Sequence, residues 1–252
     1  MDTDLAAPRR TFQEQIFNEL GQDICSGRFS PGEVLPSEMA LCDRFRVSRI
    51  VVREAVKSLA AKGILDVRRK TGTVVQPRER WHLFDPDVIG WYANSATLDE
   101  RFVADLMELR QVIEPAAARL AAVRADETDR QAIRAAFENM AKAASGQGAY
   151  VPADLAFHAA ILTACHNQFL WQMHSALSVM LRTSFTISSR VPKGPYKSLP
   201  LHEDLCVGIE AGNPDAAERA VLALIQRAES DLANAIATLP KGGQSGNIMG
   251  KT

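Results

Sequence analysis

The spacing of apolar residues divides the chain into a short first part with mixed periods and a longer second part with a helical period. In the first part, apolar residues recur every three to four positions over residues 11–26 and 49–62, which predicts amphipathic helices. A shorter helix is expected between them, with Ser37 as its N-cap. Two short runs at residues 64–68 and 73–76 then predict strands joined by a hairpin turn. This order of elements is that of a winged helix-turn-helix domain.

The second part is predicted to consist of helices. Segments with a period of 3.6 residues extend over about residues 99–124, 126–145, 150–165, 167–190, 199–211 and 214–238. Clusters of Gly and Pro predict loops at residues 146–148 and 192–195. Short connections between such helices favour an antiparallel all-helical bundle.

The expected fold class is therefore mainly α, with two domains. We expect a winged helix-turn-helix domain over residues 10–77, a linker over residues 78–98 and the helical bundle over residues 99–238. Residues 1–9 and 239–252 contain few large apolar side chains, so both ends are expected to be disordered.

Composition excludes several classes of protein. Of the 252 residues, 46% are apolar and 23% are charged, as in ordinary globular chains. No apolar run is long enough for a membrane span, and the N-terminus lacks the apolar core of a secretory signal. The isolated cysteines form no Cys-x-x-Cys pair, which argues against a zinc ribbon and favours reduced core residues in a cytoplasmic protein. They are Cys25, Cys42, Cys165 and Cys206.

The net charge of −1 conceals an asymmetry along the chain. Residues 34–80 hold eleven Lys and Arg against five Asp and Glu, a net charge of +6. Residues 81–252 hold fifteen against nineteen, a net charge of −4. This pattern is typical of a protein in which one domain meets a polyanion. A solvated basic face would give the same count, so charge alone does not decide.

The basic residues of the first part fall on the third helix and the hairpin turn. Arg49 and Arg53 lie one turn apart on the exposed helix face, and a guanidinium can bond guanine O6 and N7 together in the major groove. Ser48 at the helix start can donate to a phosphate. The turn is basic and ends in a glycine, which would let its backbone approach a minor groove. The residues of the turn predicted to contact DNA are Lys70, Thr71 and Gly72.

A second candidate site lies in the helical part. Asp154 and His158 are four residues apart, so both project from one helix face, and His202 lies in a later helix. One carboxylate and two imidazoles on facing helices suit a divalent metal. Each residue alone is more commonly structural. A two-His-one-carboxylate set also occurs in non-haem iron enzymes, but no nucleophile elbow or phosphate loop supports catalysis here.

The motifs of the first part resemble the N-terminal domain of GntR-family bacterial transcription regulators. The matching segments are Leu35-Pro36-Ser37-Glu38, Val47-Ser48-Arg49, Val52-Arg53-Glu54-Ala55-Val56 and Lys62-Gly63-Ile64-Leu65. The resemblance implies DNA contacts by Arg49, Arg53 and the wing at Gly72. Ser37 belongs to the first matching segment and is a further candidate for a DNA contact. Family members often have an Arg where this chain has Met39, so Arg44 or Lys70 is expected to supply that charge.

The helical part is similar to the FCD effector domain of FadR-type regulators in this family. Its signature of Asp-x-x-x-His, then Asn, then His is matched by Asp154, His158, Asn167 and His202. The resemblance implies a divalent ion, namely zinc, nickel or manganese. Many members have a further His where this chain has Leu224, so coordination positions are expected to stay open to water or to the effector.

The resemblance also implies residues that bind the effector. Arg110 matches a family arginine that reaches into the pocket, and Arg182 and Asn167 are further candidates. The alternative for Arg110 is a salt bridge to Glu108 or Glu114. Residues 81–91 resemble the linker of FCD regulators of sugar-acid catabolism, and we expect their aromatic side chains to pack onto the bundle.

We therefore predict a ligand-responsive transcription regulator rather than an enzyme. The resemblance implies a homodimer that represses from a palindromic double-stranded DNA operator and leaves it on binding a small carboxylate, such as an aldonate, with no membrane involved. Three alternatives stay open: a metalloenzyme, a regulator of another organic acid, and an architectural DNA-binding protein with an empty effector domain.

Overall fold

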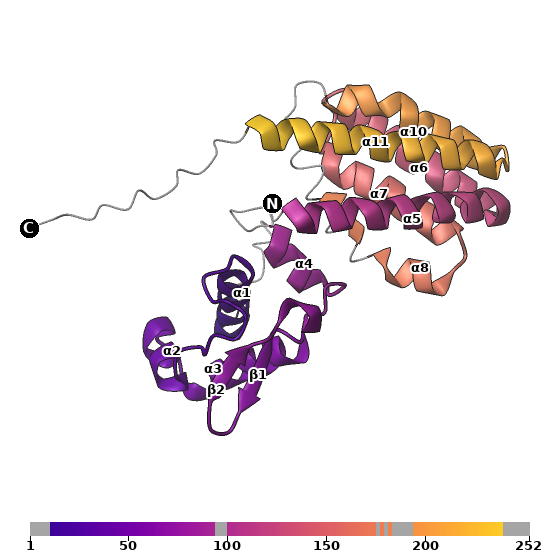
Figure 1. Cartoon of the computed structure of the whole chain (residues 1–252). Helices are drawn as coiled ribbons and strands as arrows, with labels where there is room; N and C mark the ends of the chain where they lie inside the picture. The colour runs from indigo at the N-terminus through magenta and orange to yellow at the C-terminus, as the bar shows by residue number, and fades with distance from the viewer. Residues whose placement is uncertain (1–10, 94–99, 175–176, 179–180, 183–193, 239–252) are drawn as a thin grey trace, which may run out of the picture. The chain divides into compact units, whose positions relative to one another are not determined.

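The computed structural model describes most of the chain between residue 11 and residue 238. The described residues are 11–93, 100–174, 177–178, 181–182 and 194–238, so the expected disordered ends lie outside them. The fold is mainly helical with one two-stranded sheet, as predicted (Figure 1). The chain divides into two compact units, Met1–Leu106 with Gln172–Thr183, and Met107–Trp171 with Ser184–Thr252.

The first unit begins with helices whose starts are set by local capping. Thr11 and Glu14 form a capping box, in which each side chain accepts a hydrogen bond from the other residue's backbone N–H. Ser37 caps the next helix by accepting from the N–H of Ala40, as predicted. That helix ends at Arg46 in the left-handed conformation, which makes the turn tight. The helices are α1 (Phe12–Cys25), α2 (Glu38–Phe45) and α3 (Arg49–Ala61).

A β-hairpin follows and completes the winged helix-turn-helix fold. Strands β1 (Leu65–Arg68) and β2 (Gly72–Val75) pair antiparallel. Their register places Leu65 opposite Val75 and Arg68 opposite Gly72, so both strands lie within one residue of the predicted limits. An isolated bridge from Val34 to Val74 adds the segment before α2 to the same sheet edge.

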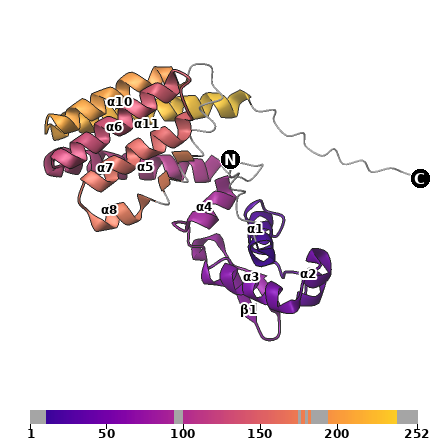
Figure 2. The ribbon, with the colours of Figure 1, turned by 180° about the vertical axis from the view of Figure 1, so that it is seen from behind.

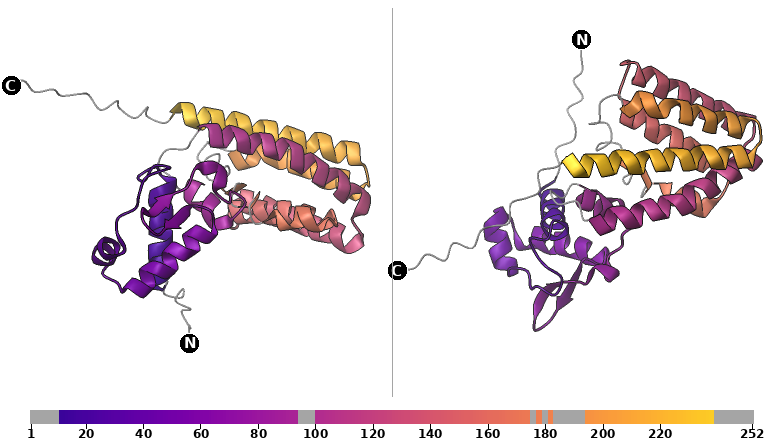
Figure 3. Two further views of the ribbon diagram at one scale, coloured as in Figure 1. Left: turned by 60° about the horizontal axis from the view of Figure 1, so that its bottom comes forward. Right: turned by 45° about the horizontal axis from the view of Figure 1, so that its top comes forward.

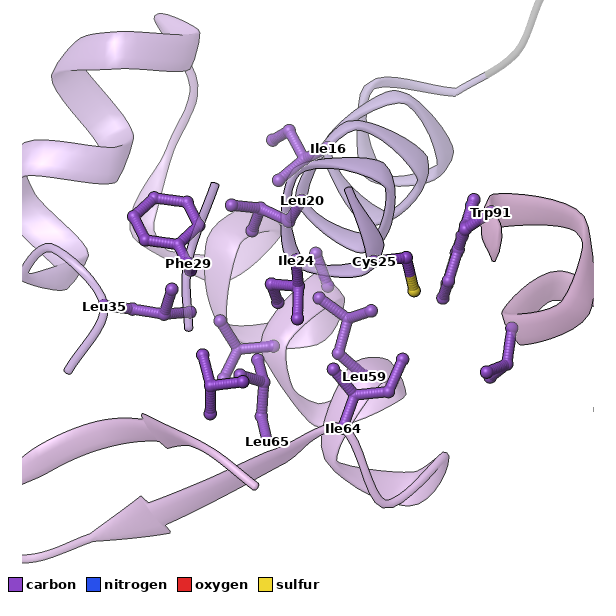
Figure 4. Packing of buried hydrophobic residues seen from close by; sticks show 14 of the residues in the cluster. Ile16, Leu20, Ile24, Cys25, Phe29, Leu35, Leu59, Ile64, Leu65 and Trp91 are labelled. Atoms are coloured by element: carbon purple, nitrogen blue, oxygen red, sulfur yellow. The ribbon is translucent and has the colours of Figure 1, made fainter. Parts of the chain in front are cut away.

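One hydrophobic core joins these elements (Figure 4). Leu20 and Ile24 of α1 point toward Leu59 of α3 and toward Leu65 of β1, and all four side chains are buried. Figure 4 also shows Trp91 beside α1, close to Cys25. Cys25 is a free, buried cysteine, and burial raises the pKa of its thiol to about 12, so the thiol stays protonated and packs as an apolar core group.

The predicted linker is part of this core. It contains a 3₁₀ turn, η1 (Arg78–Arg80), and a helix, α4 (Pro86–Ala93), where we expected an irregular connection. Trp81, Val88 and Trp91 are buried in the core of the first unit. The expectation that the linker aromatics pack onto the helical bundle was therefore wrong.

Specific contacts attach α4 to α1 and α3. The indole N–H of Trp91 donates to Asn18 Oδ1 at 3.1 Å. A Cβ at Gly21 would lie 2.5 Å from the Trp91 ring, so the close approach requires glycine at this position. Lys62, the C-cap residue of α3, contacts Asp85 just before α4 at 2.6 Å and Asp87 in its first turn at 2.9 Å. Residues up to about Tyr92 therefore form one body with the DNA-binding domain.

The helical bundle consists of long helices that run side by side (Figures 2 and 3). α6 packs against α7 and α10, and α10 packs against α11. Arg119 links α5 to α11 through Asp215 and Glu218, both at 2.6 Å. The elements are α5 (Glu100–Arg124), α6 (Glu127–Ala144), α7 (Tyr150–Ala164), α8 (Gln168–Gln172), α10 (Gly194–Glu210) and α11 (Pro214–Thr238).

The predicted extent of one helix and of one loop in the bundle was wrong. The helix expected over residues 167–190 is interrupted by a turn at Met173, and residues 183–190 lie outside the described part. The loop expected at residues 192–195 gives way to α10 from Gly194, because proline is well tolerated in a first helical turn. Within the described residues, no helix combines the length and apolar character needed to cross a membrane.

Candidate functional site

The start of α3 exposes the side chains predicted to read DNA. The side chain of Arg53 is 62% exposed and its Nε donates to both oxygens of Glu38, at 3.0 and 2.9 Å. Arg49 is exposed one turn earlier, with Met39 Sδ 3.9 Å from its Nη2. Ser48 is the N-cap of α3, but its hydroxyl makes no capping hydrogen bond. These side chains form an accessible basic surface at the N-terminus of the recognition helix.

The wing presents the other predicted residues. Lys70 and Thr71 are exposed at the hairpin turn. Gly72 has φ +93°, a left-handed conformation that L side chains rarely adopt, and a Cβ there would come within 3.3 Å of Val34. The turn is therefore narrow and basic, as a wing that approaches a phosphate backbone must be.

Two further residues predicted to contact DNA have partners within the chain. The hydroxyl of Ser37 is used to cap α2. Arg44 Nη2 lies 2.6 Å from Asp23 Oδ2 and 3.3 Å from Glu19 Oε1, so its guanidinium ties α2 to α1. These geometries favour structural roles for both residues.

Ile50 lies on the same surface and was not predicted from the sequence. Its side chain is 74% exposed beside Arg49, at the helix end predicted to enter the major groove. An apolar side chain at such a position suits the methyl group of thymine. The available signal was that Ile50 lies outside the apolar stripe of Val52, Ala55 and Leu59.

In the bundle, α7 and α10 bring the predicted metal ligands together. Asp154, His158 and His202 are all buried. The Nε2 atoms of His158 and His202 lie 3.4 and 3.3 Å from Asp154 Oδ1, and one ligand atom of each residue lies within 4.8 Å of the others. Asp154 Oδ1 is buried without a hydrogen-bond partner. A buried carboxylate oxygen between two imidazole nitrogens fits a divalent cation.

Neighbouring groups orient this cluster. His202 Nδ1 donates to the Ser198 carbonyl at 2.9 Å, which orients the ring so that Nε2 faces Asp154. Tyr150 lies 3.1 Å from Ser198 Oγ, and burial together with the charge of Asp154 raises the pKa of its phenol, so it stays protonated. Burial opposes ionisation of Asp154, but the two histidines outweigh it and hold the pKa of Asp154 well below its usual range.

Arg110 and Glu114 continue the cluster on α5. Arg110 is 1% exposed and Glu114 is 7% exposed. Arg110 Nε donates to Glu114 Oε1 at 2.6 Å and Nη2 to Oε2 at 3.5 Å. Glu114 Oε2 is also 3.8 Å from His158 Nδ1. The salt bridge considered as the alternative for Arg110 is thus present, and it adjoins the predicted metal ligands.

The other predicted effector residues are not brought into this cluster by any contact seen in the described part. Asn167 Oδ1 accepts from the N–H groups of Phe169 and Leu170, at 3.0 and 3.3 Å, and so caps α8. Arg182 is exposed. Leu224, at the position of the additional family histidine, is buried in α11. Roles of Asn167 and Arg182 in effector binding stay predictions.

A winged helix-turn-helix domain joined to a helical bundle with a buried charged cluster defines a ligand-responsive transcription regulator. Residues 12–75 match the family described as bacterial regulatory proteins, gntR family, and residues 105–227 match the FCD domain. The chain belongs to the GntR family and carries an FCD effector domain. The matched domains and relatives are transcription regulators, so the metalloenzyme alternative is set aside.

Named relatives share nearly their whole length with this chain. The galactonate operon transcriptional repressor of Escherichia coli is 35% identical over 216 residues, covering 84% of this chain and 93% of the relative. The uncharacterized regulator YieP of the same organism is 29% identical, covering 87% and 95%. Among solved structures, Lar, which controls the Listeria monocytogenes agr system, has a TM-score of 0.65 at 18% identity, covering 90% of this chain and 99% of that chain, which supports the fold alone.

Proposed function

We propose that this regulator represses genes of sugar-acid catabolism and leaves its operator when an aldonate binds the bundle. In this proposal it acts in the cytoplasm as a homodimer on a palindromic operator. The observation that carries the proposal is the continuous buried cluster of Asp154, His158 and His202 with Arg110. It combines a set of cation ligands with a guanidinium, which together suit a small hydroxy acid.

Each group has a separate part in recognition. Asp154, His158 and His202 would hold the divalent ion (zinc, nickel or manganese), which when bound supplies a Lewis-acidic partner for carboxylate and hydroxyl oxygens. Arg110 would bind the carboxylate through charge-assisted hydrogen bonds. Phe157, whose ring centroid lies 5.9 and 5.6 Å from those of His158 and His202, keeps this region apolar and strengthens the polar contacts.

Similarity to the galactonate operon repressor supports a sugar acid as the first class of effector to test. Binding would favour one arrangement of the chain over another and so change operator affinity, since an effector can act only through its different affinity for the two states. The regulator would then report the concentration of its acid as a change in transcription.

The test is a titration of operator release. The full chain first selects its operator from a random duplex library, and release of the labelled operator is then followed by fluorescence anisotropy. Galactonate and gluconate are compared with the neutral sugars galactose and glucose. We expect release by at least one acid and none by the sugars. Equal release by the neutral sugars would overturn the carboxylate proposal, and release only by lactate or another short acid would transfer it to a different organic acid.

A further inference from the structure

The guanidinium of Arg110 is already occupied by a carboxylate of its own chain. Glu114 lies one helical turn later on α5 and takes the edge formed by Nε and Nη2, at 2.6 and 3.5 Å. Among the described residues, the acceptor found for the remaining terminal nitrogen, Nη1, is the weakly accepting Met107 Sδ, at 3.9 Å. Because both charged side chains are buried, water competes little for either. A carboxylate ligand that takes the Nε–Nη2 edge must therefore compete with Glu114 for Arg110.

We propose that Glu114 is an internal competitor of the effector, which holds Arg110 until an acid displaces it. This inference rests on the proposed function, because it concerns the same site. In this inference, the strength of the Glu114–Arg110 pair sets the concentration of acid at which the regulator responds. A strong internal partner raises that concentration, since each hydrogen bond to a charged group that must be exchanged lowers the apparent affinity for the acid.

The structure also contains a second partner for the displaced carboxylate. Glu114 Oε2 lies 3.8 Å from His158 Nδ1, on the side of the imidazole opposite to Asp154. A small movement away from Arg110 would bring Glu114 within hydrogen-bond distance of this nitrogen. Displacement by the acid would then exchange one partner for another without leaving Glu114 buried and alone.

The bundle offers a matched control pair. Arg227 and Asp231 on α11 have the same spacing of four residues, with Nε 2.9 Å from Oδ2, and Asp231 is buried. This pair has no contact with Asp154, His158 or His202 in the described part of the chain. Neutralising Asp231 therefore reproduces the loss of an arginine partner without altering the candidate site.

The first experiment compares Glu114→Gln with Asp231→Asn in the operator-release titration. Glutamine keeps the size of the side chain but binds Arg110 without a charge. We expect the galactonate concentration at half-release to fall roughly tenfold or more in Glu114→Gln and to be unchanged in Asp231→Asn. An unchanged or higher half-release concentration in a folded Glu114→Gln variant would overturn the inference.

The second experiment does not depend on the identity of the effector. Glu114→Ala leaves both a space and an unpartnered guanidinium, and acetate is small enough to enter that space. We expect acetate to raise the melting temperature of Glu114→Ala, with chloride at equal ionic strength as reference. The wild-type chain should show no such rise, and Asp231→Ala should show a smaller one, because the Arg227 side chain is 30% exposed and stays hydrated. Failure of acetate to stabilise a folded Glu114→Ala variant would show that this guanidinium does not receive an external carboxylate.

The two proposals fail in different ways. If no acid releases the wild-type chain from its operator but acetate stabilises Glu114→Ala, the proposed function fails while the carboxylate exchange at Arg110 stands. If acids release the wild-type chain and both Glu114 variants behave like their controls, the proposed function stands and the competitor role of Glu114 fails.

Discussion

The DNA-binding surface and the buried cluster each contain an ion pair between an arginine and a glutamate. One pair is exposed to water and the other is buried. Arg53 and Glu38 pair where both side chains are exposed, whereas Arg110 and Glu114 pair in the interior of the bundle. In water an ion pair is weak, so Arg53 can exchange Glu38 for a phosphate or a base at little cost. In the interior, separating the two charges is costly, so Arg110 changes partner only for another carboxylate. The surface is thus suited to reversible contact, and the cluster to selective exchange.

A large effect is expected on the binding of a divalent ion by the cluster. Purified wild-type protein should hold about one ion per chain, and His158→Ala should weaken Ni²⁺ binding by more than about 100-fold, since it removes a ligand outright. Titration calorimetry measures the affinity. Operator binding by the ion-free protein should be unaffected, because the ligands lie outside the DNA-binding unit. Equal ion content in wild-type and His158→Ala protein would show that the histidine is structural.

Removal of Arg110 should test the energetic importance of the buried ion pair. Arg110→Ala removes the positive charge that neutralises the buried Glu114 carboxylate at 2.6 Å, so we expect the free energy of unfolding to fall by about 3–5 kcal/mol. Urea unfolding followed by circular dichroism gives this value. A loss below about 1 kcal/mol, as for an exposed pair, would contradict the contrast between the two sites.

Removal of Arg53 should test the exposed side. Arg53→Ala should lower operator affinity about tenfold or more while leaving the melting temperature unchanged, because its pair with Glu38 is open to water. Fluorescence anisotropy at several salt concentrations measures both the loss and the salt dependence. If thermal stability fell as far as in Arg110→Ala, the exposed pair would have to be regarded as structural.

A smaller effect is expected where α4 joins the first unit. Trp91→Phe removes the hydrogen bond to Asn18 and part of a buried ring, which should destabilise this unit by about 1–2 kcal/mol. Trp171→Phe is the matched control, because Trp171 is exposed. Equal stability of the two variants, measured by chemical unfolding, would mean that α4 is not held by this contact.

The smallest effect concerns acid stability of the bundle. A hydrogen bond from Arg134 lowers the pKa of Glu210 relative to the unfolded chain. The pair therefore contributes stability above the unfolded pKa of about 4.3, and this contribution is lost as the pH falls through the lower folded value. With both side chains partly exposed, the contribution is about 1 kcal/mol or less. Glu210→Gln should make the melting temperature less dependent on pH below about 4.5. The same pH dependence in the variant and the wild-type chain would contradict this.

Local signals predicted much of the fold. Ser37 and Asp126 mark helix starts because capping depends on residues only two or three positions apart. Asp154 and His158 share a face because a helix repeats every 3.6 residues. The approach of His202 followed from the family resemblance, since nothing local relates α10 to α7.

What the sequence did not predict depends on contacts between distant segments. The aromatic residues Trp81 and Trp91 suit either hydrophobic core. The space above Gly21 and the hydrogen bond to Asn18 assign Trp91 to the first unit. The hydrogen bond from its own indole to the Gln76 carbonyl assigns Trp81 to the same unit. Glu114 was named from the sequence, together with Glu108, as an alternative partner of Arg110. Its proximity to His158 requires the packing of α5 beside α7, which no local pattern contains.

The distribution of tryptophan gives the molecule built-in optical labels. Trp81 and Trp91 are buried in the core of the first unit, whereas Trp171, the third tryptophan of the chain, is 56% exposed on α8. Buried indoles fluoresce at shorter wavelength than indoles in water, and dissolved quenchers reach them less readily. The short-wavelength emission therefore reports the packing of the DNA-binding unit, and the quenchable emission reports the surroundings of α8. The unmodified chain can thus be followed at both places with a single spectrum.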